Sequence, residues 1–409
     1  MVAASPDGGL LTAVFNPFTE EFRADPYPEL AALRAEDPVH FIAATGMWIL
    51  SRHADVAAVL RDDACFSSHR PLFDRIAAMA PEGKPQEFLQ RAKQTMLVQD
   101  PPDHTRLRNL VTKAFTPRVV ENLRPRVSDL LGELLATVEG GTMDVIADVA
   151  VPLPLYVIME LLGMPPADRP MLKQWSDDLA ILVDGTIALD RLGPAERAAS
   201  ALEAYVGELV GARRRAPRAD LLSGLIAAQE QGDVLSDEEL FSTVAILLVA
   251  GHETTTGLIG NGMLALLRNP EAQDQLRSHR VSIRDAVEEL ARYDSPVQLA
   301  TRTALTEVVL GGKTIARGQE VVCLIGAANR DPERFADPDR LDLGRPDNRH
   351  LAFGHGIHFC LGAPLARVEA QVVCSTLLER FPRLRLVSEH VEWREGFVLR
   401  KPRALPVAL

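Results

Sequence analysis

The stretch LAFGHGIHFCLGAPLAR, Leu351–Arg367, concentrates glycines around a single cysteine. Gly354, Gly356 and Gly362 lie within a span of nine residues. Glycines at this density permit positive-φ turns or a close approach of the backbone to a flat ligand. Cys360 stands just before the predicted helix PLARVEAQVVCSTLLERF, so a thiolate there would feel the positive end of that helix and could accept backbone N–H bonds. A thiolate stabilised in this way is a good soft ligand for a metal.

Three interpretations of Cys360 are open at this point. The cysteine could simply be a buried residue in a turn, which is common for this residue type. It could bind zinc together with His355 and His358, although the spacing is tight and no distant pair of Cys or His residues completes a familiar set of four ligands. It could instead be the axial thiolate ligand of a haem iron.

The composition is that of a soluble globular protein. The chain has 409 residues, 47% hydrophobic and 24% charged, and can bury a large core. Its formal net charge of −12 makes nucleic acid an unexpected partner. The four cysteines include no CxxC pair, which fits a reducing compartment better than a disulfide framework. We expect a cytoplasmic protein without signal peptide or membrane anchor, because no apolar run reaches roughly 18–20 residues.

A second informative segment is the long apolar stretch from Ser236 to Pro270. Ser236 followed by Glu239 fits a capping box, and Pro270 stops the pattern. The expected helix has roughly 31 residues and a length of about 46 Å, so it could cross the whole molecule. Its middle, AGHETTT (Ala250–Thr256), is polar. The zinc-protease motif H-E-x-x-H fails there, because its second histidine would fall on a threonine.

The chain is predicted to be mostly helical, with a small β portion near both ends. Apolar residues recur at three- and four-residue steps over about 100–295 and about 360–380, which indicates helices. β-branched alternation and Gly-containing turns favour strands over about 30–60, about 297–330 and the C-terminal tail. Residues 70–104 mix prolines with charged and apolar residues, and we expect a loop there.

The run around Cys360 resembles the haem-binding signature of the cytochrome P450 family: Phe, two residues, Gly, three residues, Cys, one residue, Gly. Here these positions are Phe353, Gly356, Cys360 and Gly362. The resemblance covers essentially the whole chain and is strongest with the soluble bacterial branch. It implies a single P450 domain over residues 1–409, mainly α, in which a triangular helical bundle holds haem b between the long central helix and the helix after the cysteine.

The resemblance also implies roles for residues that contact the haem. Haem propionates are anions, so His and Arg side chains are suitable partners for them. The positions that match the propionate-binding residues of the family are His104, Arg108, Arg302 and His358. The implied iron ligand and the implied haem loop are Cys360 with Phe353, Gly354 and Gly362.

The family has, in addition, a buried structural Glu-x-x-Arg pair that a later arginine completes. Glu289 and Arg292 match the pair, and Arg334 matches the later arginine. Taken alone, an ion pair at this spacing is common on helix surfaces, so the assignment rests on the resemblance.

Within the polar notch, AGHETT (Ala250–Thr255) matches the oxygen-activation motif of the family. The resemblance implies an alcohol role for Thr254 and an acid role for Glu253, with Ala250 and Gly251 making room for oxygen. Cleavage of an O–O bond consumes protons, which a hydroxyl and a nearby carboxylate can supply to a dry pocket. A threonine hydroxyl can also bond the carbonyl four residues earlier. The alternative is a satisfied polar spot in a buried helix, and His252 receives no role.

The implied activity is that of a haem-thiolate monooxygenase, an oxidoreductase that inserts one oxygen atom of dioxygen into a lipophilic small molecule by C–H hydroxylation or epoxidation. We expect a secondary metabolite such as a polyketide, macrolide, terpenoid or steroid, with a fatty acid as the alternative. The chain holds no flavin or nicotinamide domain, so the resemblance implies electrons from a separate ferredoxin and its reductase. We expect a monomer. A haem peroxygenase, which would not need Glu253 and Thr254, and a noncatalytic haem protein are the alternative functions.

Two further sets of residues follow from these expectations. An acidic ferredoxin would favour a basic patch on the cysteine side of the haem, for which the candidates are Arg106, Lys113, Arg118 and Arg367. Apolar residues at the substrate-contacting positions of the family are Met96, Leu97, Leu179, Ile181, Leu182, Leu247, Ala250, Val297, Ala300 and Phe397. Each of these could equally be a core residue.

Overall fold

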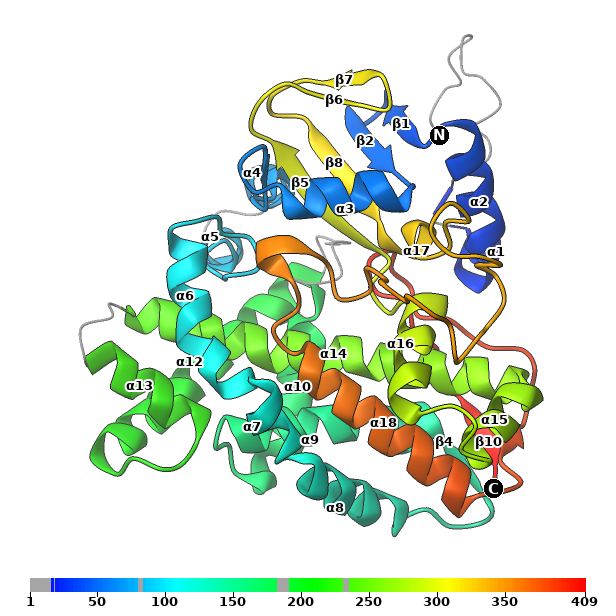
Figure 1. Ribbon diagram of the computed structural model, residues 1–409. Coiled ribbons are helices and arrows are strands. Elements are labelled where there is room, and N and C mark those ends of the chain that lie inside the picture. The colour runs from blue at the N-terminus through cyan, green and yellow to red at the C-terminus, as the bar shows by residue number, and fades with distance from the viewer. Residues whose placement is uncertain (1–15, 18, 80–83, 182–190, 231–234) are drawn as a thin grey trace.

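The computed structural model describes residues 16–17, 19–79, 84–181, 191–230 and 235–409. A large helical portion lies next to a smaller portion built around a β-sheet (Figure 1). The predicted mainly α architecture with a small β portion is confirmed.

The described helices follow one another through mostly short connections. They are α1 (Glu20–Ala24), α2 (Tyr27–Glu36), α3 (His53–Arg61), α4 (Pro71–Met79), α5 (Lys84–Ala92), α6 (Asp103–Thr112), α7 (Pro117–Glu121), α8 (Arg124–Leu135), α9 (Pro152–Leu161), α10 (Arg169–Leu179), α12 (Leu192–Arg215), α13 (Leu221–Glu230), α14 (Asp237–Arg268), α15 (Pro270–Arg277), α16 (Ile283–Tyr293), α17 (Ile325–Ala328) and α18 (Ala363–Arg380).

The main sheet has five strands, and it carries one of the predicted haem contacts. Its order is β1 (Val39–Ile42), β2 (Met47–Leu50), β8 (Glu320–Leu324), β5 (Leu299–Ala304) and β3 (Phe66–Ser67). β2 and β8 are parallel, and the other neighbours are antiparallel. The register of β5 places Arg302 opposite Val321 and Ala300 opposite Cys323 of β8.

The C-terminal tail belongs to a second, smaller sheet. This sheet has the order β4 (Thr142–Asp144), β10 (Pro406–Ala408) and β9 (Arg385–Leu386), and a separate hairpin joins β6 (Val308–Leu310) to β7 (Lys313–Ile315). β4 lies inside the stretch predicted to be helical. Three residues that form a strand only by pairing with a distant one leave no periodic pattern in the sequence.

The structure differs from the loop predicted for residues 70–104, which contain α4 and α5. Pro71 is the first residue of α4 and Pro85 the second residue of α5. Proline fits these positions because the first N–H groups of a helix have no intrahelical partner. α5 buries Phe88 and Leu89, and this one-sided burial stabilises a helix that the mixed composition did not reveal.

The long helix α14 crosses the helical portion (Figure 1) and packs against α9, α16 and α18. The Glu239 N–H donates to Ser236 Oγ at 3.1 Å, and the Ser236 N–H donates to Glu239 Oε2 at 2.9 Å, so the predicted capping box is confirmed. The helix ends at Arg268, before Pro270, as expected. Within the described ranges, α14 alone has the length and apolar character of a membrane span. However, 78% of its most apolar window is buried inside the protein, as expected of a core helix.

Candidate active site

The loop that leads to Cys360 forms a tight turn against the end of α3. The Cys360 N–H donates to the Phe353 carbonyl at 2.8 Å. Gly354 and Gly356 have φ angles of 73° and 71°, a region that favours glycine. A Cβ on Gly356 would lie 2.5 Å from the Leu60 carbonyl oxygen. The packing of this loop against α3 therefore requires glycine at position 356.

Cys360 lies just before the first turn of α18, as predicted. Burial raises the pKa of the Cys360 thiol, while the backbone N–H groups of Gly362 and Ala363 and the Arg108 guanidinium act in the opposite direction. Burial prevails and the pKa is raised, so a stable thiolate here needs a nearby positive centre such as a metal ion. A Cβ on Gly362 would meet no protein atom within 4 Å, which leaves room for a flat ligand beside the sulfur.

Five side chains with cationic or imidazole groups gather near this loop. Burial, together with the neighbouring Arg302, His104, Arg108 and Arg70, lowers the pKa of His358 to about 2. The His104 and His358 rings lie 4.0 Å apart, centroid to centroid, and His104 Nδ1 and His358 Nε2 are buried without a hydrogen-bond partner. None of the five forms an ion pair within the part of the chain that the structure describes. Such a group fits an anion with several oxygen acceptors, and the propionates of a haem have this chemistry.

The arginines of this cluster come from three separate elements. Arg108 of α6 donates to the Phe359 carbonyl, beside Cys360, at 2.5 Å. Arg302 of β5 donates to the Thr301 carbonyl at 2.9 Å. Arg70, between β3 and α4, was not predicted from the sequence, because no motif marks it. Burial lowers its pKa to about 10, and the nearby Arg302 contributes.

The predicted Glu-x-x-Arg pair lies in the core of the structure. Arg292 Nε and Nη2 donate to the two carboxylate oxygens of Glu289 at 2.7 and 2.8 Å, and both side chains are fully buried. The Asn348 amide and the Asp342 N–H also donate to Glu289, at 3.1 and 2.9 Å. Each oxygen of Glu289 thus accepts from two of these donors.

The prediction that Arg334 completes this group is wrong, because the later arginine is Arg345. Arg345 Nε donates to both oxygens of Glu289 at 3.1 Å. Its other nitrogens donate to the carbonyls of Ala336, Asp337 and Arg340, so the chain turns around its guanidinium. Arg334 instead pairs with Asp347 at 3.0 Å and is partly exposed. Both arginines follow the Glu289–Arg292 pair in the sequence, and only the tertiary turn shows which of them reaches Glu289.

Three residues of the polar notch share the half-exposed face of α14. Ala250, Gly251 and Thr254 are partly exposed, whereas their neighbours His252 and Glu253 are buried. Thr254 Oγ1 donates to the Ala250 carbonyl at 3.0 Å, which is the bond to the fourth preceding residue that the sequence predicted. The Thr254 hydroxyl therefore has an acceptor within the helix and remains beside a half-exposed surface.

Gly251 has a packing role that the sequence did not predict. A Cβ on Gly251 would lie 3.2 Å from Cγ1 of Ile158 in α9. Its missing side chain thus allows α9 to approach α14, and the role of Gly251 in making room for oxygen stays a prediction. Ala250 is the residue of this pair whose side chain could line a pocket on the half-exposed face.

Glu253 is buried and fully ion-paired. Glu253 Oε2 accepts from Lys401 Nζ at 2.6 Å and from Arg394 Nη1 at 2.8 Å. Burial by itself would raise the pKa of Glu253, but His252, Lys401 and Arg394 hold it well below its usual range. Glu253 is therefore a carboxylate at neutral pH, and the two cations, from the C-terminal tail, have no signal in the sequence around the notch.

One predicted substrate contact lines a cavity. Leu179 contributes to a cavity of about 260 Å³ between α5, α10, α12 and α14, together with Phe88, Phe241 and Ala245. Leu182 lies outside the residues that the structure describes. A larger cavity of about 930 Å³ lies among α6, α8, α9 and α13, and no residue of the cysteine loop lines it.

The remaining predicted substrate contacts pack in hydrophobic clusters and line neither of these two cavities. They are Met96, Leu97, Ile181, Leu247, Val297, Ala300 and Phe397. Their place in a substrate pocket stays a prediction.

Two of the four candidate residues for a basic patch already form internal ion pairs. Arg106 pairs with a glutamate of α14, and Arg367 pairs with a glutamate of α16 at 2.6 Å. Lys113 and Arg118 are exposed. The patch available to an acidic partner is thus smaller than the sequence suggested.

Comparison with known proteins gives consistent matches over nearly the whole chain. The family model described as Cytochrome P450 matches residues 195–404. Polyketide biosynthesis cytochrome P450 PksS of Bacillus subtilis (strain 168) is 38% identical over 406 residues, which cover 97% of this chain and 98% of that protein. Mycinamicin IV hydroxylase/epoxidase of Micromonospora griseorubida is 42% identical over 367 residues, 88% and 89% of the two chains.

A solved structure is similar in fold as well as in sequence. The crystal structure of P450BioI in complex with hexadec-9Z-enoic acid-ligated acyl carrier protein superposes with a TM-score of 0.87 at 39% identity. The match covers 96% of this chain and 100% of that chain.

Proposed function

Because the chain belongs to the cytochrome P450 family and is a monooxygenase of that family, we propose that it oxidises a lipophilic secondary metabolite with one oxygen atom of dioxygen. The observation that carries this proposal is the position of Cys360, just before α18 and beside a cluster of unpaired cationic and imidazole groups. The family implies a haem-thiolate cofactor, and a thiolate ligand favours O–O cleavage.

We propose haem b as this cofactor, bound through protein groups that the structure brings together. When bound, the haem supplies thiolate-ligated iron for the activation of dioxygen. Cys360 would be the axial ligand, and the propionates would be held by His104, Arg108, Arg302 and His358. Arg70 lies in the same cluster and would contribute a third guanidinium.

The chain itself would supply a hydroxyl and a carboxylate near the reacting oxygen. Thr254 Oγ1 now donates to the Ala250 carbonyl, and a rotation about χ1 would release this proton to an acceptor on the half-exposed face of α14. Ala250 would line the same face. Glu253 would act as the acid only when a neighbouring group delivers a proton to it, because its ion pairs keep it ionised.

The substrate class is proposed from the relatives and from the character of the cavity residues. PksS is named for polyketide biosynthesis, and the Micromonospora enzyme is named as a hydroxylase and epoxidase of mycinamicin IV. These names support a polyketide or macrolide as the substrate and either hydroxylation or epoxidation as the reaction. Leu179, Phe88 and Phe241 supply apolar surface to the 260 Å³ cavity, which charged side chains also line. A fatty acyl substrate is the second candidate, because the similar P450BioI structure holds a hexadecenoic acyl group on its carrier protein.

The proposed partners and setting complete this function. A separate ferredoxin with its reductase would deliver electrons, and the exposed Lys113 and Arg118 support contact with an acidic partner. We propose a monomeric, cytoplasmic protein whose 409 residues form one P450 domain.

A ligand screen tests the proposal directly. Haem-loaded protein would be titrated with mycinamicin IV, related macrolides, steroids and hexadec-9-enoic acid, and the spin state of the iron followed by absorption. Compounds that shift the spin state would then be incubated with ferredoxin, reductase and NADH. We expect an oxygenated product that depends on the ferredoxin. Product formation with hydrogen peroxide but not with ferredoxin would instead indicate a peroxygenase, and no product from any compound would indicate a noncatalytic haem protein.

A further inference from the structure

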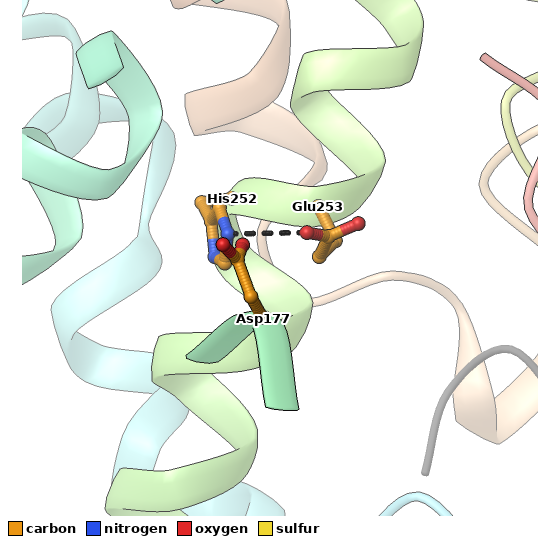
Figure 2. A group of neighbouring side chains, drawn as sticks. All are labelled: Asp177, His252 and Glu253. Carbon is orange, nitrogen blue, oxygen red and sulfur yellow. Dashed lines mark ion pairs between the residues drawn. The ribbon is translucent and has the colours of Figure 1, made fainter. Parts of the chain in front are cut away.

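Asp177, His252 and Glu253 meet in a small group beside the polar notch (Figure 2). Asp177 comes from α10, whereas His252 and Glu253 are consecutive in α14. One ligand-type atom from each lies within 4.8 Å of those of the other two. His252 has no role in the sequence motif, and the site described above uses only Glu253.

The hydrogen bonds of His252 fix which ring nitrogen faces the carboxylates. His252 Nδ1 lies 3.0 Å from the Leu248 carbonyl oxygen and 3.3 Å from Ser176 Oγ. A carbonyl oxygen only accepts, so Nδ1 carries a hydrogen and donates it to Leu248. His252 Nε2 is the buried nitrogen without a hydrogen-bond partner, and it lies 3.4 Å from Glu253 Oε1.

This geometry favours a proton on Nε2. In the neutral ring with hydrogen on Nδ1, a lone pair on Nε2 would face carboxylate oxygens, which carry no hydrogen to donate. A protonated Nε2 would face Glu253 as a donor and remove that conflict. A shift of a few tenths of an ångström brings Nε2 and Glu253 Oε1 within hydrogen-bond distance.

The two oxygens of Glu253 have separate surroundings. Oε2 is occupied by Lys401 Nζ at 2.6 Å and Arg394 Nη1 at 2.8 Å. Oε1 faces His252. A proton can therefore reach the Glu253 carboxylate most directly through Oε1, and His252 is the titratable group at that oxygen.

The side chains of this group differ in solvent exposure, which is high for Asp177 and very low for His252 and Glu253. The Asp177 side chain is 45% exposed and pairs with Lys173 at 2.7 Å, whereas the His252 and Glu253 side chains are 1% and 3% exposed. The Asp177 carboxylate thus contacts water, and the buried His252 and Glu253 side chains lie next to it. The charged groups packed around His252 are Asp177 of α10, Glu253 of α14 and, through Glu253, the tail residues Lys401 and Arg394.

We propose that Asp177, His252 and Glu253 form the route by which protons from solvent enter the polar notch of α14, with His252 as the carrier. The inference rests on the proposed function, in which protons are consumed beside Thr254. A proton on His252 Nε2 moves to Glu253 Oε1 and leaves a neutral ring and a carboxylic acid. Glu253 passes this proton into the pocket and returns to the carboxylate, while Asp177 delivers a proton from water to Nε2. One proton enters in each cycle, and no electron is transferred along the route.

A divalent metal ion is the other occupant that the three ligands could accept. The structure favours the proton, because the Lys401 ammonium already lies 2.6 Å from Glu253 Oε2 and would repel a nearby divalent cation. Binding of a metal ion is therefore an outcome of the test that would overturn the proposal.

The first measurement does not depend on turnover. Haem-loaded protein labelled with ¹⁵N-histidine would be studied by NMR in its diamagnetic, reduced and carbon-monoxide-bound form at pH 7. His252→Gln identifies the His252 signals. We expect a hydrogen bonded to Nε2 in the unsubstituted protein, and a changed Nε2 signal in Asp177→Asn but not in Asp178→Asn, a carboxylate substitution next to it on the same helix. An Nε2 without hydrogen, or a signal that zinc sulfate shifts stoichiometrically at micromolar concentration, would refute the relay.

The second measurement follows proton delivery during turnover with the compound that gives the largest spin shift in the ligand screen. We expect His252→Gln to lower product formation by about 10²-fold, the low end for a positioned proton-transfer group. It should also raise peroxide release and enlarge the ratio of rates in H₂O and D₂O. Asp177→Asn should change these quantities in the same direction, while Asp178→Asn leaves them unchanged.

The two proposals fail in distinguishable ways. Suppose that the unsubstituted protein forms product, and that Asp177→Asn and His252→Gln show the same coupling and the same solvent isotope effect as Asp178→Asn. The relay is then refuted, while the monooxygenase function stands. If no compound gives ferredoxin-dependent product, the proposed function fails, and the relay with it. Because Asp177 is half-exposed, its Asn variant keeps the relay falsifiable even if the buried His252→Gln variant does not fold.

Discussion

Removal of the Arg345 side chain should destabilise the protein much more than removal of the Arg334 side chain. Arg345 Nε lies 3.1 Å from both oxygens of Glu289, and these two side chains are 6% and 0% exposed. Arg334 pairs with Asp347, and those side chains are 25% and 57% exposed. The two substitutions remove the same chemical group from a buried and from an exposed ion pair.

The expected magnitudes follow from this difference in burial. Loss of one partner from a buried ion pair costs about 3–5 kcal/mol. Glu289 keeps Arg292 at 2.7 Å, so we expect the lower value, about 3 kcal/mol, for Arg345→Ala. An exposed pair contributes about 0–1 kcal/mol, which bounds the effect of Arg334→Ala. With an unfolding entropy of about 2.1 cal/mol/K per residue, 3 kcal/mol corresponds to a fall in Tm of about 3–4 °C for 409 residues.

The assay is urea-induced unfolding of haem-loaded protein at pH 7, followed by circular dichroism. Arg345→Lys is a useful third variant, because it keeps the charge but cannot donate from a planar fork to Glu289 and the surrounding carbonyls. We expect it to lie between the wild type and Arg345→Ala. The assignment of Arg345 would be refuted if Arg334→Ala cost as much free energy of unfolding as Arg345→Ala.

Three further predictions concern Thr254 and Gly251 of the notch and Glu288 of α16. Thr254→Ala should lower product formed per NADH and raise peroxide release, because a proton donor is lost; unchanged coupling would contradict its role. Gly251→Ala should stabilise the protein less than the helix propensity of alanine suggests, because the added Cβ would lie 3.2 Å from Ile158. In an Ile158→Ala background the same change should stabilise the protein by up to about 1 kcal/mol, and an equal effect in both backgrounds would show that no clash exists. Burial would raise the pKa of Glu288, but His350 and Arg367 lower it to about 2 from 4.5. This carboxylate therefore stabilises the fold above pH 4.5, and its contribution is lost as pH falls toward 2. The free energies of unfolding of the wild type and Glu288→Gln should thus differ by about 2–3 kcal/mol at pH 7 and converge near pH 2; a difference independent of pH would contradict the ion pairs.

The features predicted correctly from the sequence are mostly local in the chain. The capping box joins Ser236 to Glu239, the Glu289–Arg292 pair spans one helical turn, and the Thr254 hydroxyl bonds a carbonyl four residues earlier. Helical geometry alone brings such groups together. Four members of the cluster around His358 were named through resemblance alone, since they come from α6, β5 and the cysteine loop, and their contact with haem propionates stays a prediction.

The features that were missed depend on packing between distant segments. Arg345 was not distinguished from Arg334, because the turn that wraps its guanidinium is tertiary. Lys401 and Arg394 neutralise Glu253 from more than a hundred residues away, so the ionised state of Glu253 could not be read from the notch. The contact that a Cβ on Gly251 would make with Ile158 depends on how α9 crosses α14, which no periodicity encodes.

The central claim is that Cys360 binds a haem iron as a thiolate, and the absorption spectrum of the reduced, carbon-monoxide-bound protein tests it most directly. We expect the unsubstituted protein to show the red-shifted band of a thiolate-ligated haem. Cys65→Ser, at another partly exposed cysteine, should keep this band, and Cys360→Ser should lose it. Persistence of the red-shifted band in Cys360→Ser would contradict the claim.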